Sequence, residues 1–255
     1  MDLAWLCLFA LLAGFVDSIV GGGGLIQLPA LFVFLPKELA ASVPLVFGTN
    51  KLSSICGTSV AVAQYARRVP IPWASIIPAA IAAFLFSALG VRVLQSVPNE
   101  FLKPLTLVLL IAVAIYTYAN KKWGDLHAPK FAAHHERSLA IAAGVVIGFY
   151  DGFFGPGTGS FLIFLFIGLL GFDFLTASAS SKVINFATNL AAVLVFAARG
   201  DILDHYALPM GACNVAGALL GTRLALLKGN KFVRVIFLTV VGVMIARFAY
   251  EQFWK

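Results

Sequence analysis

The chain has 255 residues, of which 61% are hydrophobic and only 11% are charged, and its formal net charge is +7. A water-soluble domain carries about 25% charged residues, and folding buries only about 75% of the surface of a chain this size, so an ordinary soluble globule is excluded. No basic stretch is interleaved with stacking aromatics, which excludes a nucleic-acid-binding module, and the positive charge is typical of the loops of a membrane protein.

Apolar stretches alternate with short polar gaps along the whole chain. In order, they are residues 3–20, 25–35, 41–66, 73–94, 105–119, 139–154, 161–170, 176–198, 206–227 and 233–250. A helix needs about 20 residues to cross a bilayer, so most stretches can span it, whereas 25–35 and 161–170 reach only about halfway. We expect an all-α polytopic protein of the cell (inner) membrane, with about eight full spans within a range of about seven to ten.

The two halves of the chain resemble each other. Gly14-Phe15-Val16-Asp17 matches Gly148-Phe149-Tyr150-Asp151, and later matches in the same order are Lys51 with Lys182, Arg68 with Arg199, Pro78 with Pro209, Gly90 with Gly221 and Arg92 with Arg223. We expect a first repeat over residues 1–120, a polar linker over 121–138 and a second repeat over 139–255. Each repeat would contain a glycine-broken or re-entrant helix pair and about three spanning helices. Counts of Lys and Arg do not distinguish parallel from inverted repeats, and the half-membrane stretches favour inverted ones.

Each short apolar stretch follows a glycine-rich break. Free amides and the aligned dipole at a helix N-terminus attract an anion, and glycine lets the backbone approach it. Such breaks are tolerated in a membrane where they are buried in protein or line a cavity. Thr158 and Ser160 would add hydroxyl donors, and Gln27 would reach back from the first short helix. The glycines predicted to bind the anion are Gly21, Gly22, Gly23, Gly24, Gly155, Gly157 and Gly159.

Two lysines lie inside apolar stretches at matching positions, Lys51 and Lys182. A lysine at mid-membrane is energetically expensive, and such residues mark the path of a substrate or an ion. Asn50 precedes the first lysine, and Asn185 and Asn189 follow the second on one helix face, because they are four residues apart. We add these five residues to the predicted substrate site.

Asp17 and Asp151 are a matched pair of carboxylates inside the apolar stretches. Three interpretations of them stay open. They could form structural ion pairs with the two lysines, they could accept hydrogen bonds from the amides of the glycine loops, or they could carry a coupling proton.

The segments 14–24 and 148–159, together with Thr49-Asn50-Lys51 and the run from Ser181 to Asn185, resemble the sulfite exporter TauE/SafE family, also called the 4-toluene sulfonate uptake permeases. The resemblance covers nearly the whole chain. It implies a membrane transporter for sulfur oxyanions or organosulfonates such as sulfite, thiosulfate and sulfoacetate.

We therefore expect a secondary transporter that holds a small sulfur-containing anion at the N-termini of two broken helices near the midplane. We expect no enzymatic activity, no cofactor, no metal and no nucleic acid, and the sequence contains no GxxxxGK[ST] motif. A homo-oligomer is compatible with the sequence. The alternatives are a permease for another small anion or for a cation, an intramembrane aspartyl protease with Asp17 and Asp151 as its carboxylates, and a purely structural membrane protein.

Overall fold

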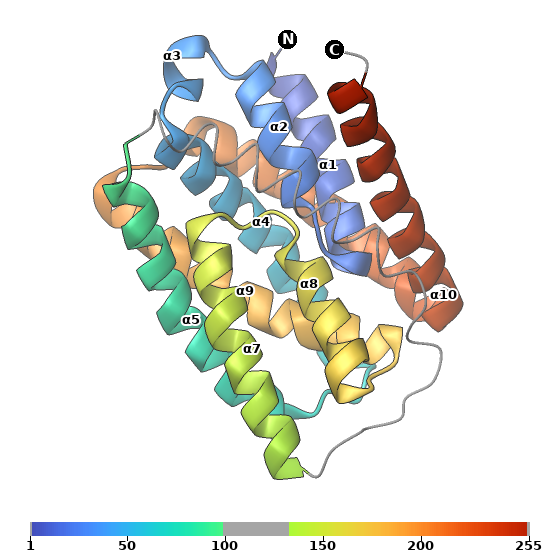
Figure 1. Cartoon of the computed structure of the whole chain (residues 1–255). Coiled ribbons are helices and arrows are strands. Elements are labelled where there is room, and N and C mark those ends of the chain that lie inside the picture. Colours follow the sequence, from blue (N-terminus) through green and yellow to red (C-terminus); the bar gives the residue numbers. More distant parts are fainter. Residues whose placement is uncertain (1, 99–132, 254–255) are drawn as a thin grey trace.

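The computed structural model describes residues 2–98 and 133–253, and every element within these ranges is a helix (Figure 1). The predicted stretch 105–119 and the linker as far as residue 132 lie outside the described residues. The helices are α1 (Asp2–Val20), α2 (Gly24–Phe34), α3 (Lys37–Ala40), α4 (Val43–Ala66), α5 (Trp73–Ser96), α7 (Ala133–Phe153), α8 (Thr158–Leu165), η1 (Phe166–Leu170), α9 (Phe174–Arg199) and α10 (Asp204–Phe253).

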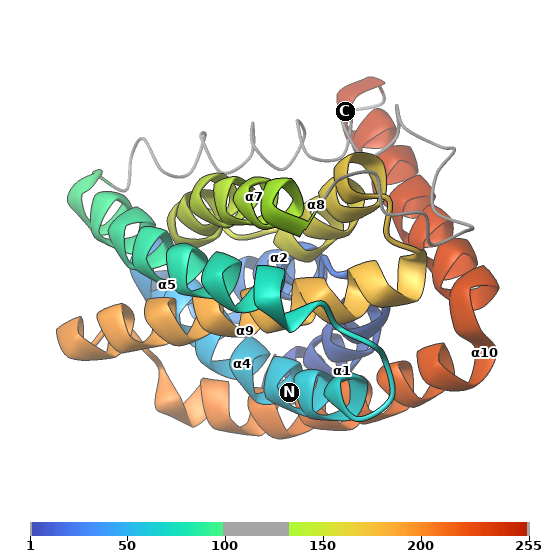
Figure 2. The ribbon, with the colours of Figure 1, turned by 90° about the horizontal axis from the view of Figure 1, so that it is seen from below.

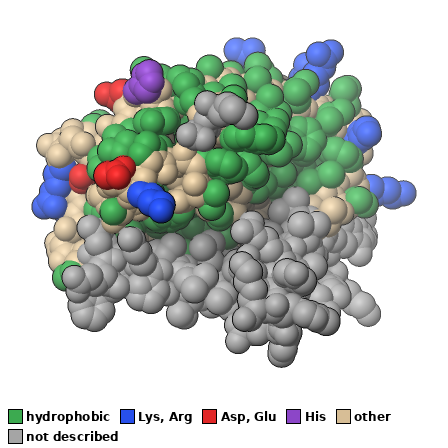
Figure 3. Space-filling view, turned by 90° about the horizontal axis from the view of Figure 1, so that it is seen from above, with side chains coloured by type: hydrophobic (Ala, Val, Ile, Leu, Met, Phe, Trp, Pro, Cys, Tyr) green, Lys and Arg blue, Asp and Glu red, His purple; other side chains and the backbone are tan. Residues whose placement is uncertain are grey.

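Four helices of the described part are long and apolar enough to cross a membrane: Leu3–Val20, Trp73–Ser96, Phe174–Arg199 and Asp204–Val233. The two stretches predicted to reach only halfway are indeed shorter apolar helices, Gly24–Phe34 and Thr158–Leu170. The total of about eight spans stays a prediction. Figure 3 shows hydrophobic side chains gathered over much of the described surface on one face, with most Lys and Arg side chains towards its edges.

Local sequence signals set the helix ends. Asp173 caps α9, because its carboxylate accepts the amide hydrogen of Thr176 at 2.9 Å. Gly200 ends α9 in the left-handed conformation that glycine adopts readily. Within α10 the chain turns at Gly229, whose φ of 68° and ψ of −161° are not helical, and Figure 2 shows the last part of α10 turning away there. This turn separates the two apolar stretches predicted at 206–227 and 233–250.

Helices from the two halves of the chain pack against each other. α1 lies along α10, and α7 lies along α5 (Figures 1 and 2). Both contacts are very close: a Cβ atom on Gly221 would collide with the carbonyl oxygen of Phe15, and one on Gly90 would collide with that of Phe149. These two glycines match each other in the sequence comparison, and so do the two phenylalanines. In Figure 1, α1 runs down from the N-terminus and α7 runs up.

Candidate functional site

The chain leaves the helical conformation at both predicted glycine breaks. Gly21 and Gly22, between α1 and α2, have φ angles of 76° and 88°. Gly155 and Gly157, between α7 and α8, have φ angles of 92° and 84°. Side chains with a Cβ atom rarely adopt this left-handed region, so these four positions require glycine.

The two breaks touch each other at the centre of the molecule. A Cβ atom on Gly159 would lie 2.6 Å from the Cα atom of Gly21, and one on Gly21 would collide with the backbone of Gly159 and Ser160. Only glycine permits this approach. The contact brings together the N-termini of α2 and α8, although the two helices are more than a hundred residues apart in the chain.

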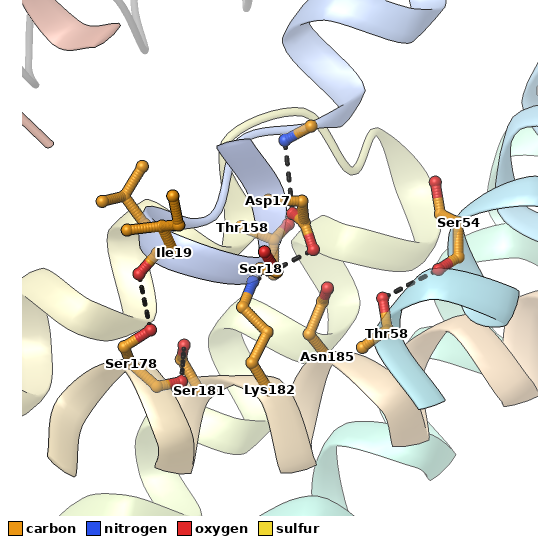
Figure 4. A network of polar contacts seen from close by, with 12 residues as sticks. Asp17, Ser18, Ile19, Ser54, Thr58, Thr158, Ser178, Ser181, Lys182 and Asn185 are labelled. Carbon is orange, nitrogen blue, oxygen red and sulfur yellow. Dashed lines mark hydrogen bonds and ion pairs between the residues drawn. The ribbon is translucent and has the colours of Figure 1, made fainter. Parts of the chain in front are cut away.

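Side-chain hydroxyl groups from other helices satisfy the free carbonyl groups at the end of α1. The carbonyl oxygen of Ser18 accepts a hydrogen bond from Tyr65 at 2.8 Å, that of Ile19 from Ser178 at 2.6 Å, and that of Val20 from Ser160 at 3.0 Å. Figure 4 shows the bond between Ser178 and Ile19. An unpaired carbonyl at this depth would be costly, so these bonds are what allow the helix to break inside the protein.

Lys51 and Asp151 form a fully buried ion pair. Their Nζ and Oδ2 atoms are 2.7 Å apart, and the two side chains are 4% and 1% exposed. The ammonium group of Lys51 also donates to Oδ1 of Asn189 at 3.1 Å. The pair joins α4 to α7, so a lysine of the first half neutralises an aspartate of the second.

In the second ion pair the aspartate comes from the first half of the chain and the lysine from the second. Nζ of Lys182 on α9 lies 3.0 Å from Oδ2 of Asp17 on α1 (Figure 4). Lys182 is fully buried, whereas the Asp17 side chain is 19% exposed, and its Oδ1 accepts the amide hydrogen of Gly23 at 3.2 Å. Two of the three interpretations of the aspartates therefore occur together in Asp17. Because each aspartate has its own lysine, the arrangement does not fit a protease dyad that shares one proton.

A polar cavity of about 30 Å³, with room for about two water molecules, lies between the two breaks. Most of the predicted site residues meet here. Its lining is Asp17, Gly22, Gly24, Asn50, Lys51, Ser54, Gly155, Gly157, Thr158, Gly159, Asn185 and Asn189.

Several polar groups around the cavity have no protein partner. Asn50 is 5% exposed, and its Oδ1 atom has no hydrogen-bond partner among the described residues. Within the same part of the chain, the backbone amides of Gly22, Gly157 and Gly159 donate to no protein acceptor. A buried polar group normally finds a partner, so these groups are available to a ligand or to water.

Some predicted site residues do not line the cavity. Gln27 is fully buried elsewhere, where its Oε1 accepts a hydrogen bond from Asn214 at 3.0 Å. Gly21 lies in the contact between the breaks, and a Cβ atom on Gly23 would meet the Asp17 Cβ at 2.7 Å rather than the cavity. Lys182 does not line the cavity itself but is bonded to Asp17, which does. Its Nζ atom lies 3.3 Å from the position of a Cβ atom on Gly159, another lining residue.

The predicted hydroxyl donors are already engaged. Ser160 donates to Val20 and lies outside the cavity lining, and Thr158 donates to the carbonyl oxygen of Gly155 at 2.7 Å. Ser54, one of the short polar side chains near Lys51, also lines the cavity, one helical turn after Asn50.

Membrane-length apolar helices around a polar cavity, with two helices broken at that cavity, define an integral membrane protein of the transporter class. A family model described as Sulfite exporter TauE/SafE matches residues 6–248. The chain belongs to this family and is a membrane transporter.

Curated relatives are similar over almost their whole length. "Probable membrane transporter protein ORF9" of a Sinorhizobium species is 38% identical over 96% of this chain and 90% of the relative. "Probable membrane transporter protein" of Haemophilus influenzae is 35% identical over 99% and 96%. "Probable membrane transporter protein YfcA" of Escherichia coli K12 is 34% identical over 95% and 88%. No solved structure matches the chain.

Proposed function

We propose that this protein is a secondary transporter of the cell membrane for a sulfur-containing oxyanion or organosulfonate of the sulfite, thiosulfate or sulfoacetate type. The anion would bind between the N-termini of α2 and α8, near the midplane. The family description, Sulfite exporter TauE/SafE, supports the substrate class.

The observation that carries the proposal is the meeting of two helix N-termini at one polar cavity. The four charged side chains, two lysines and two aspartates, cancel one another. What remains is the positive end of two helix dipoles, each equivalent to about half an elementary charge. The partnerless amides of Gly22, Gly157 and Gly159 and the side-chain amides of Asn50 and Asn185 add hydrogen-bond donors for oxyanion oxygens.

We further propose that residues 1–120 and 139–255 are inverted repeats joined by the linker 121–138. The crossed ion pairs, the reciprocal packing of α1 on α10 and α7 on α5, and the opposite directions of α1 and α7 support this arrangement. Inverted repeats around one midplane site are the basis of alternating access, in which one repeat rocks against the other. The full chain would then cross the membrane about eight times.

A permease for another small anion or for a cation is the second candidate. The Asp17 carboxylate and the partnerless Oδ1 of Asn50 both lie at the cavity and are acceptor atoms that suit a cation. A cation at this site would have to bind despite repulsion from the positive ends of the two helix dipoles.

Thermal stabilisation of the purified protein by sulfite, thiosulfate, sulfate, sulfoacetate and an aryl sulfonate tests the proposal, with chloride as a control. A ligand at 100 times its Kd adds about 2.7 kcal/mol to the folded state. Asn50→Ala and Asn185→Ala are expected to reduce this shift. Asn230→Ala is the matched control, because Asn230 accepts the amide hydrogen of Leu175 away from the cavity. Stabilisation by a cation, and by none of the anions, would refute the sulfur-anion assignment.

A further inference from the structure

The two crossed ion pairs have the same chemistry and different surroundings. Lys51 and Asp151 are both shielded, and Lys51 has a second acceptor in Asn189. Lys182 is more deeply buried than Lys51, yet Asp17 is its one acceptor in the described part of the chain. Asp17 itself lines the cavity and is 19% exposed, whereas Asp151 is 1% exposed and does not line it. Of the two carboxylates, only that of Asp17 therefore lines the cavity.

We propose that Asp17 is a proton-binding site that couples anion binding to proton uptake, and that Asp151 is its counterpart with a structural role only. This inference rests on the proposed anion transport and assigns the coupling ion to the same site. A hydronium ion in the cavity transfers its proton to the Asp17 carboxylate, an O–H bond forms there, and a water molecule leaves.

Protonation of Asp17 changes the charge balance around the cavity. With both aspartates ionised, the two lysines are neutralised. Once Asp17 is neutral, Lys182 keeps a buried positive charge without a counter-ion, which is strongly unfavourable. The Nζ atom lies 3.3 Å from the Cβ position of Gly159, which lines the cavity. An anion in the cavity replaces the lost counter-charge, so the proton and the anion bind cooperatively.

Among the described residues, no other ionisable group could replace Asp17 as the proton-binding site. α2 and α8 contain none. From α9 Asp17 faces Lys182, and from α4 it faces Tyr65, which is bonded to the neighbouring Ser18 carbonyl. Lys51, also on α4, is held by Asp151 of α7. α10 presents Asn214, Gly217 and Gly221 to α1, and its Arg223 is exposed.

The test is the pH dependence of thiosulfate binding to the full-length protein in detergent. Thiosulfate is the anion of a strong acid, so its own charge stays constant near neutral pH. Uptake of one proton with the anion predicts that Kd falls about tenfold for each unit by which pH is lowered, over the range in which free Asp17 is ionised. Asp17→Asn, which resembles the protonated form, is expected to bind thiosulfate with no pH dependence. Asp151→Asn is the matched control: the dependence of its thiosulfate Kd on pH should equal that of the wild type, even if the Kd itself changes.

A second measurement does not depend on an anion. Infrared difference spectra on acidification should contain, among the C=O stretching bands of protonated carboxyl groups, one component that is present in the wild type and in Asp151→Asn and is missing in Asp17→Asn. If Asp17→Asn does not fold, the double variant Asp17→Asn with Lys182→Met removes both charges and should lack the band as well.

The outcomes separate the two proposals. Thiosulfate binding that is independent of pH in the wild type, or a slope that disappears in Asp151→Asn and persists in Asp17→Asn, overturns the inference and leaves the anion site standing. If no sulfur anion binds at any pH, the proposed function fails. The infrared band then still decides whether Asp17 takes up a proton.

Discussion

At the scale of single residues, the buried charges determine where the protein is most sensitive. Both side chains of the Lys51–Asp151 pair are buried, so the cost of removing the two charges from water opposes their Coulomb attraction. Such a pair adds little net stability, yet removal of one partner leaves an uncompensated charge in the interior. The pair is therefore better understood as a constraint on how α4 and α7 fit together than as a source of stability.

Lys51→Met is expected to lower the free energy of unfolding by about 3–5 kcal/mol, because Asp151 is left charged and unpaired. The double variant Lys51→Met with Asp151→Leu should recover most of that loss. Chemical unfolding in detergent, followed by circular dichroism, measures both. Additive losses in the double variant would show that the two side chains do not interact.

The glycines of the breaks divide into two kinds. Gly24 lines the cavity, and a Cβ atom on it would lie 3.5 Å from the Cα of Pro156 and 4.0 Å from Nδ2 of Asn50, both ordinary contacts. A Cβ atom on Gly21 would collide with the second break and would require φ near 76°. Gly24→Ala should keep the stability of the wild type and weaken anion binding. Gly21→Ala should lose about 2–4 kcal/mol of stability. Thermal melting with and without anion distinguishes them, and unchanged anion affinity in Gly24→Ala would place the ligand elsewhere.

At the scale of elements, the break after α1 depends on hydroxyl groups from three other helices. Tyr65 of α4, Ser178 of α9 and Ser160 of α8 each donate to one of the last carbonyl oxygens of α1. The broken helix is thus held by its neighbours and not by its own backbone bonds, which explains how an irregular segment persists inside an apolar protein.

Ser178→Ala should lower the free energy of unfolding by about 1–3 kcal/mol, because the Ile19 carbonyl loses its donor in a buried place. Ser59→Ala is the control, since Ser59 is exposed and bonds within its own helix; its effect should stay within about 0.5 kcal/mol. Denaturant unfolding of the two variants gives the comparison. Equal effects would mean that the α1 end is satisfied in another way.

At the scale of the whole molecule, the directions of the helices predict which loops share a membrane face. α7 runs parallel to α5, since Gly144 lies against Ala79 and Gly152 against Ser87. α1 runs the opposite way (Figure 1). The starts of α1 and α7 should therefore lie on opposite faces.

Single cysteines in a variant without Cys7, Cys56 and Cys213 test this topology. Glu38→Cys and Ala198→Cys should react with a membrane-impermeant thiol reagent from one face, and Arg68→Cys and Arg137→Cys from the other. The measurement compares labelling in right-side-out and inside-out vesicles. Labelling of Arg137→Cys together with Glu38→Cys would contradict inverted repeats and favour parallel ones.

The sequence by itself determined the features that depend on composition and local backbone chemistry. These are the membrane class, the helix breaks at Gly21–Gly24 and Gly155–Gly159, and the short helices that follow them. Glycine runs and apolar lengths act within a few residues, so they can be read along the chain. A polar group inside an apolar stretch needs a polar partner, and Lys51 and the three asparagines selected on that ground line the same cavity.

Only the tertiary structure decided which groups meet. Lys51 pairs with Asp151 across 100 residues, and Lys182 pairs with Asp17 across 165, each crossing to the other half. Gln27 accepts a hydrogen bond from Asn214 and does not line the cavity. The residue that matches Asn214 in the first repeat is Ala83, so the comparison of the two halves gave no reason to expect a polar partner there. The greater exposure of Asp17 relative to Asp151 also results from the packing of the helices. Pairing and burial depend on which helices pack side by side, and the order of residues along the chain does not by itself specify which helices are neighbours.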